Sequence, residues 1–133
     1  MYPYTLAPKP LSPITFYILL ALSRQELHAY ALKGAISNDS LGSIQAKPGV
    51  LYPLLTKLFE EGLIEQTGLK PAGKSGQERT HYGITHEGLL QLKDELKRLQ
   101  HAVKIGEAAG LMADETPTDI QRLLAQLHEG DEP

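Results

Sequence analysis

The sequence contains no cysteine, and this absence excludes disulfides, thiolate metal sites and cysteine nucleophiles together. It also lacks any apolar run that reaches the roughly 18 to 20 residues of a membrane span. Its first residues, Met1–Tyr4, lack the basic region followed by an uninterrupted apolar stretch that is typical of a signal peptide. We therefore expect a cytoplasmic protein. Its 133 residues, 41% of them hydrophobic, suit one globular unit with one core.

Positive charge is scarce in the chain as a whole but unevenly placed. Thirteen basic residues against 16 acidic ones give a net charge of −3, which argues weakly against nucleic-acid binding. Residues 107–133 contain seven acidic residues against Arg122 alone, a net charge of −6, so the rest of the chain carries +3. A modestly basic body beside an acidic tail is compatible with local contacts to phosphates.

The stretch from Gly49 to Ile64 has the clearest pattern. Leucines recur at the spacing of an apolar helical stripe, at Leu51, Leu54, Leu55 and Leu58. The opposite face carries small, hydroxylated and aromatic groups, namely Gly49, Tyr52, Pro53, Thr56 and Glu60, with Lys57 at its edge. Gly62 stands where a helix ends in the left-handed conformation. The pattern predicts a helix with one face on the core and the other able to lie against another surface.

Two shorter helices are expected before this one. Ser12 followed by Pro13 is a helix-start signal and predicts a buried helix to about Ser23. A second helix is predicted over His28–Ile36, with Tyr30, Ala31 and Ile36 facing inward, and a turn over Ser37–Gly42. Two helices, a turn and a third helix with a polar outer face form a helix-turn-helix pattern.

A β-hairpin is predicted directly after Gly62. Leu63–Thr67 and Thr80–Thr85 have the composition of strands, and the glycine- and lysine-rich segment 68–78 between them predicts a flexible wing. Lys70, Lys74 and Arg79 against Glu78 give the wing a local charge of +2, in keeping with contact to a phosphate backbone. The expected fold class is mainly α with a small β-hairpin, a winged helix-turn-helix.

The wing also contains a competing motif. Gly68–Ser75 satisfies the G-x-x-x-x-G-K-[ST] pattern of a nucleotide-binding loop. That loop needs a helix directly after it, because the helix N-terminus helps to hold the phosphates. The residues that follow, Gly76–Ile84, have the alternation of a strand. A flexible wing that contains a lysine explains the same residues, and nucleotide binding stays as the weaker alternative.

The longest periodic segment begins near Thr85, which can cap a helix. Its apolar residues alternate steps of three and four, the spacing of a heptad seam: Leu89, Leu92, Leu96, Leu99 and Val103. The seam can pack on another subunit, or alternatively on its own domain. We expect an N-terminal arm over residues 1–11, a winged-helix domain over 12–86, a dimerisation helix over 87–112, and an acidic C-terminal helix and tail over 113–133.

Little in the sequence favours catalysis. The five histidines do not form a metal-ligand spacing on one helix face, so no metal site is predicted. No pair of carboxylates differs from ordinary solvated charge. We expect neither an enzyme nor a bound cofactor.

The chain resembles the PadR-like transcriptional regulators over about Leu11–Leu99. The most specific segments are Leu27–Leu32, Gly49–Leu55, Glu60–Ile64 and Tyr82–Gly88. The resemblance implies a winged-helix DNA-binding domain, a C-terminal helix for homodimerisation, and repression relieved by a small-molecule effector, whose pocket the sequence does not locate. It also implies that Tyr52 is a recognition-helix tyrosine and Arg79 an arginine of the wing. Family wings look like G-R-P-R-K-Y-Y, whereas residues 76–82 here have lost two positive positions and gained a negative one.

These observations together predict a DNA-reading surface. Two copies of the helix after Lys47 would enter successive major grooves of a pseudo-palindromic double-stranded operator. The residues expected to approach bases or the sugar-phosphate backbone are Gly49, Tyr52, Pro53 and Thr56, and those expected to neutralise phosphates are Lys47, Lys57, Lys74 and Arg79. Alternatively, Tyr52 covers the edge of the core and Lys57 is an ordinary solvated lysine. A winged-helix protein-interaction module without DNA binding remains the other class of function.

Overall fold

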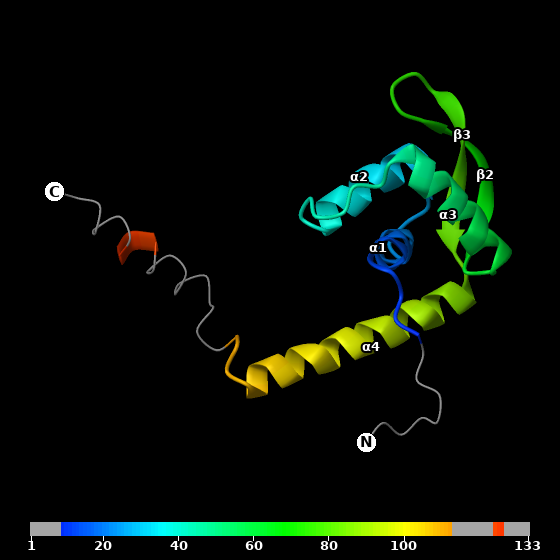
Figure 1. Ribbon diagram of the computed structural model, residues 1–133. Helices are drawn as coiled ribbons and strands as arrows, with labels where there is room; N and C mark the ends of the chain where they lie inside the picture. Colours follow the sequence, from blue (N-terminus) through cyan, green and yellow to red (C-terminus); the bar gives the residue numbers. More distant parts are fainter. Residues whose placement is uncertain (1–8, 113–123, 127–133) are drawn as a thin grey trace. The chain divides into compact units, whose positions relative to one another are not determined.

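The computed structural model describes residues 9–112 and 124–126, and within them helices α1, α2 and α3 pack with a small three-stranded antiparallel sheet (Figure 1). The elements are α1 (Pro13–Leu22), β1 (Leu27–His28), α2 (Ala29–Asp39), α3 (Pro48–Glu60), β2 (Ile64–Ala72), β3 (Gln77–Ile84) and α4 (His86–Ala108). Most of the expected N-terminal arm and of the expected last helix lies outside the described residues. The chain divides into two compact units, Met1–Glu95 and Leu96–Pro133, which we describe separately.

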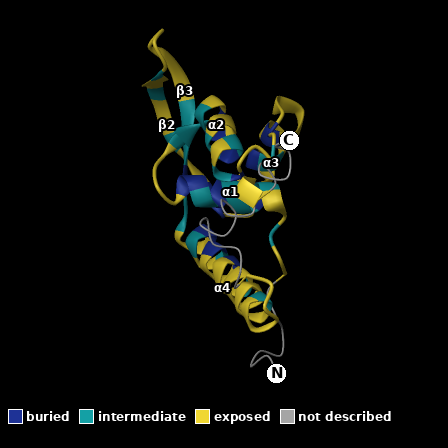
Figure 2. Ribbon diagram, turned by 90° about the vertical axis from the view of Figure 1, so that its left-hand side faces the viewer, coloured by how far each residue is buried: buried dark blue, intermediate teal, exposed yellow. Residues whose placement is uncertain are grey.

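Helix α1 is the centre of the first unit. The Ser12 hydroxyl accepts a hydrogen bond from the Thr15 N–H at 3.3 Å, and Pro13 occupies the first turn, as the sequence predicts. Its buried residues join those of α2, α3 and β2 in one hydrophobic cluster. Figure 2 shows burial concentrated in α1 and the helices around it, while the outer part of the hairpin is exposed. The apolar character of α1 is therefore explained by burial within its own chain.

Helix α2 begins later than predicted, because Leu27 and His28 form the short strand β1. Its buried residues are Ala29, Leu32 and Ile36. The prediction that Tyr30 faces inward is wrong, since the Tyr30 side chain is 80% exposed. The start of the helix at Ala29 places Tyr30 on the outer face.

Helix α3 has the predicted stripe and the predicted end. Leu51, Leu55 and Leu58 are buried. The chain leaves the helix through Gly62, whose φ is +76°. The Leu63 N–H donates to the Leu58 carbonyl and the Gly62 N–H to the Phe59 carbonyl, each at 3.0 Å. This pair of bonds is a Schellman motif, which satisfies carbonyls at the helix end.

The sheet has the order β1-β3-β2, so β3 is hydrogen-bonded on both edges. The predicted strands are shorter than the observed ones, because residues 68–72 and 77–78, predicted to lie between the strands, belong to β2 and β3. Backbone pairing continues outward to Ala72 opposite Gln77, with a register shift between Gln66 and Gly68. The residues between the strands, 73–76, form a turn in which Gly73 and Gly76 have φ values of +71° and +68°. The next element after segment 68–75 is β3 and not a helix, so no helix N-terminus stands directly after the segment to bind a nucleotide phosphate.

Helix α4 is joined closely to the end of α3. The Thr85 hydroxyl accepts from the Gly88 N–H at 3.0 Å and donates to the Gly62 carbonyl at 2.6 Å. Thr85 is thus the predicted cap. Gly88 packs against the Leu63 carbonyl so closely that an added Cβ would lie 2.1 Å from that oxygen. The helix can begin at this place only with a glycine in its first turn.

The seam of α4 is divided between two environments. Leu92 is 2% exposed and belongs to the core of its own chain, and Leu89 is half-buried. Leu92 is therefore removed from the predicted dimer interface, because a buried side chain cannot also cover a partner. In the second unit Leu96, Leu99 and Val103 are 41%, 36% and 43% exposed. Within the described part of the chain, no helix is long and apolar enough to cross a membrane.

Substituting Gly88 tests the junction between α3 and α4. We expect Gly88→Ala to lower the free energy of unfolding by at least about 2 kcal/mol, because the methyl group collides with backbone. Gly34→Ala is the matched control. It also lies within a helix but has open space around it, and it should stabilise the protein by about 0.5–1 kcal/mol. Urea unfolding of both variants measures the difference, and equal effects of the two substitutions would contradict the close contact.

Leu41 offers a second test, because it occupies the position after α2 that Gly62 occupies after α3. Its φ is +55° and its side chain is 95% exposed. The Gly42 N–H donates to the Ser37 carbonyl and the Leu41 N–H to the Asn38 carbonyl, which again forms a Schellman motif. Leu41→Gly should raise the free energy of unfolding by about 1 kcal/mol through relief of the left-handed backbone. Leu41→Ala keeps the Cβ and should give no such gain in urea unfolding. If Leu41→Ala raised the free energy of unfolding as much as Leu41→Gly, the gain would come from removal of the exposed leucine side chain and not from relief of the backbone.

Candidate nucleic-acid interface

The outer face of α3 is exposed along its length. Tyr52 is 53% exposed, so it does not cover the core, and Pro53, Thr56 and Lys57 are also exposed. Gly49 lies in the first turn of α3, with open space where a Cβ would stand. The hydroxyl of the exposed Thr56 donates to the Tyr52 carbonyl at 3.2 Å, which leaves the hydroxyl oxygen able to accept a further hydrogen bond. This face can approach a partner closely and offers few charges of its own.

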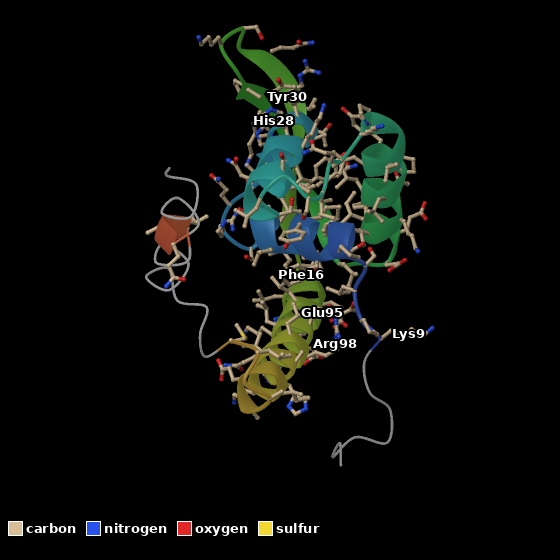
Figure 3. All side chains as sticks on the ribbon, turned by 60° about the vertical axis from the view of Figure 1, so that its left-hand side comes forward. Lys9, Phe16, His28, Tyr30, Glu95 and Arg98 are labelled. Atoms are coloured by element: carbon tan, nitrogen blue, oxygen red, sulfur yellow. The ribbon has the colours of Figure 1, made fainter. Side chains whose placement is uncertain are left out.

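A hollow of about 400 Å³ lies beside Tyr52, between α3, the start of α2 and the hairpin. Its aromatic and basic lining consists of His28, Tyr30, Tyr52, Arg79 and Tyr82, and Ala29, Leu69, Glu78 and Thr80 complete it. Figure 3 shows His28 and Tyr30 at the start of α2, next to the base of the hairpin. The fold thus brings together Tyr52 and Arg79, which the sequence predicts separately.

The hollow shifts the ionisation of two of its side chains. Burial raises the pKa of the Tyr82 phenol, and the nearby Tyr52 adds to this shift. Burial lowers the pKa of His28, and the charges of His81 and Arg79 lower it further. Both groups are therefore held in their neutral forms. Arg79 provides the fixed positive charge of this lining, and Glu78 provides the opposing one.

The predicted cations occupy different surroundings. Lys47 is the N-cap residue of α3 and is exposed, and Lys74 is exposed in the hairpin turn. Lys57 Nζ lies 3.9 Å from a carboxylate oxygen of Glu61, the C-cap residue of α3. The Arg79 guanidinium donates to the Gln77 side-chain oxygen at 3.1 Å. Lys47 and Lys74 lie outside the lining of the hollow, so the structure does not gather all four cations at one place.

The sequence counts Lys70 as one of the free positive charges of the wing, and the structure corrects this. Its ammonium group forms an ion pair with Glu26, a residue that precedes β1. The same hydrogen bond is the main cause of the lowered pKa of Glu26. A lysine in contact with a carboxylate contributes less positive potential to the surface than the sequence suggests.

Sequence reasoning missed three residues of the hollow. The sequence predicts Tyr82 only as part of a strand and Tyr30 as an inward-facing residue, and it predicts no role for His28. All three belong to two of the four most specific sequence segments, Leu27–Leu32 and Tyr82–Gly88, and their position in these segments is the available signal. A smaller hollow of about 290 Å³ also includes Tyr82 in its lining, together with Leu55, Thr56, Phe59, Glu60 and Gln66.

A helix-turn-helix formed by α2 and α3 is followed by the β2–β3 hairpin, and β3 also pairs with the short strand β1. This arrangement defines a winged-helix protein. Residues 18–94 match the Transcriptional regulator PadR-like family. This match covers more than half of the chain, and the protein belongs to that family. Members of the family are transcriptional regulators.

Solved structures agree with this assignment. A transcriptional regulator from Thermoplasma acidophilum is 34% identical, with 71% of this chain and 87% of that chain covered and a TM-score of 0.55. A PadR-like transcriptional regulator from Bacillus cereus is 27% identical over 72% of this chain and 89% of that chain, with a TM-score of 0.60. A PadR family transcription regulator from Clostridium difficile shares the fold at 21% identity, with coverage of 73% and 97% and a TM-score of 0.60. No curated protein matches the sequence.

Proposed function

We propose that this chain is a dimeric, cytoplasmic repressor that binds a specific DNA sequence through α3 and the hairpin. The observation that carries the proposal is the grouping of the exposed Tyr30 and Tyr52 with Arg79 around one hollow. An aromatic and cationic surface beside an exposed helix suits a DNA backbone next to a major groove into which the helix fits.

Contacts to bases would come from the outer face of α3. Tyr52 and Thr56 offer hydroxyl groups and apolar surface, which suit base edges and thymine methyl groups. Gly49 and Pro53 present little bulk, and the backbone of α3 can therefore approach the groove closely. Specificity in this arrangement rests on Tyr52 and Thr56 more than on charge.

Contacts to phosphates would come from the cations around this face. Arg79 lies in the hollow, Lys74 in the hairpin turn, and Lys47 and Lys57 at the two ends of α3. Each phosphate neutralised releases counterions, so affinity falls with salt in proportion to the number of such contacts. Four cations per chain give a modest salt dependence for each subunit.

Dimerisation would use the exposed part of the α4 seam. Leu96, Leu99 and Val103 stay one or two helical turns apart, and Leu89 is half-buried at the start of the helix. Two subunits would present two α3 helices to successive major grooves, about 34 Å apart, on a pseudo-palindromic operator. The family resemblance adds a small-molecule effector that relieves repression.

One observation favours a second function, a winged-helix module that binds protein. Lys70 is paired with Glu26, Lys57 lies near Glu61, and the whole chain is acidic. A protein partner would need fewer free cations than DNA does.

Replacing Tyr52 tests the DNA-binding face. Tyr52→Ala should weaken binding to the DNA upstream of the protein's own gene by about 10- to 100-fold, the usual effect of losing one good base contact. A gel-shift titration measures this, with Tyr52→Phe as the matched control that keeps the ring. The free energy of unfolding, measured by thermal unfolding, should change by no more than about 0.5 kcal/mol, since the Tyr52 side chain is half exposed. Absence of any shift at low salt, for the wild type as for the variants, would exclude the repressor and leave the protein-interaction module.

Arg79 provides a separate test of the phosphate contacts. Arg79→Gln should reduce the slope of log affinity against log salt by about 0.9 for each chain, because one phosphate contact is lost. Lys93→Gln removes the same charge from an exposed position on α4, outside this face, and should leave the slope unchanged. Fluorescence anisotropy with labelled operator DNA at several salt concentrations gives both slopes. Equal slopes for the two variants would mean that Arg79 does not touch a phosphate.

A further inference from the structure

His28 and His81 form a close pair at the base of the hairpin. They are direct partners in the antiparallel pairing of β1 with β3, so their side chains leave the same face of the sheet. Their ring centres are 5.2 Å apart, and the ring planes are inclined by 51°. Both residues are half-buried and therefore within reach of a small solute. The DNA-binding proposal makes no use of His81.

The hydrogen bonds of this pair leave ring nitrogens open. His81 Nδ1 lies 2.9 Å from the Arg79 carbonyl, which can only accept, so in the neutral ring this nitrogen carries the proton and Nε2 keeps a lone pair. His28 is the N-cap residue of α2, but its side chain makes no capping bond. Among the residues that the structure describes, neither nitrogen of His28 has a hydrogen-bond partner. A histidine whose other nitrogen donates to a backbone carbonyl is oriented as metal-binding histidines are.

We propose that His28 and His81 together bind a divalent transition-metal ion of the class that prefers imidazole, such as Zn²⁺, Cu²⁺ or Ni²⁺. For tetrahedral zinc with Zn–N bonds of about 2.0–2.1 Å, two coordinated imidazole ring centres lie about 5 Å apart. The observed separation agrees with this distance. Imidazole nitrogen is a preferred ligand of these three ions, whereas magnesium and calcium require oxygen.

The charges around the pair define what kind of site this is. Within the described ranges, no three histidine, cysteine or acidic side chains form a group that could hold a metal, so water completes the coordination. His28 is held neutral by its surroundings, as a ligand must be. The positive charge of Arg79 interacts with His28 and disfavours a bound cation. The negative charge of Glu26 interacts with His81 and favours one. The result is an open, exchangeable site instead of a closed structural one.

Binding at this place would have a mechanical effect. The strand β1 has two residues, and His28 is also the residue from which α2 starts. A metal ion held by both rings would fasten the start of α2 to β3 more firmly than the backbone pairing alone. The expected consequence is a higher unfolding temperature, because the ion binds the folded chain and not the unfolded one.

A titration of the full chain, prepared without a histidine tag, tests the site without DNA. With Zn²⁺ alone, calorimetry should show one ion for each chain and the Tm should rise by several degrees. His28→Gln and His81→Gln should each abolish both effects. His86→Gln and His101→Gln are the matched controls, since both histidines are exposed residues of α4 and belong to no strand of the sheet, and they should bind as the wild type does.

Copper provides a readout that a merely structural effect of the substitutions would not produce. The electron paramagnetic resonance spectrum of the Cu²⁺-loaded chain should show coupling to two imidazole nitrogens, and the spectrum of each single variant should not. Circular dichroism of the metal-free variants checks that they are folded. No rise in Tm at saturating Zn²⁺, or unchanged binding in His81→Gln, would overturn the proposal.

Discussion

The central position of β3 in the sheet is the constraint on which the candidate interface depends. One edge of β3 pairs with Leu27 and His28 of β1, and the other pairs with β2 along the hairpin. Because α2 starts at Ala29, directly after β1, this pairing ties the start of α2 to the hairpin. Tyr30 belongs to α2 and Arg79 to β3, and β1 is the link that holds these two elements together. Without this link the hollow between the two side chains would have no fixed width.

A second junction fixes the other end of α3. The Gly62 carbonyl accepts from the Thr85 hydroxyl, the Leu63 carbonyl accepts from the Thr85 N–H at 3.1 Å, and Gly88 packs against that same Leu63 oxygen. The end of α3, the two inner ends of the hairpin and the start of α4 therefore meet within a few residues. With its apolar stripe buried and its end held there, α3 has little freedom to rotate, and its outer face keeps one orientation.

Sequence reasoning succeeded where neighbours in the chain decide the structure. Ser12 with Pro13, Gly62 and Thr85 each act within about one helical turn, and each limits a helix as predicted. It failed where distant residues decide. A two-residue strand exists only as the edge of β3, and the glycines of segment 68–78 did not show that backbone pairing continues past them. The outer face of α3 followed from helical period alone, but the hollow combines residues of β1, α2, α3, β2 and β3, so His28, Tyr30 and Tyr82 could not be placed around it from their local sequence.

Ion pairing has a similar consequence for the proposed DNA complex. Counting Lys70 among the cations of the wing overlooks Glu26, a carboxylate far away in the sequence and adjacent in the fold. The cations of the hairpin that remain exposed are Lys74 and Arg79. A surface with few free cations gains little affinity for DNA of arbitrary sequence, because non-specific binding depends on phosphate contacts. Each base contact made by Tyr52 or Thr56 then accounts for a larger share of the total affinity, and the ratio of specific to non-specific binding rises even though overall affinity is lower.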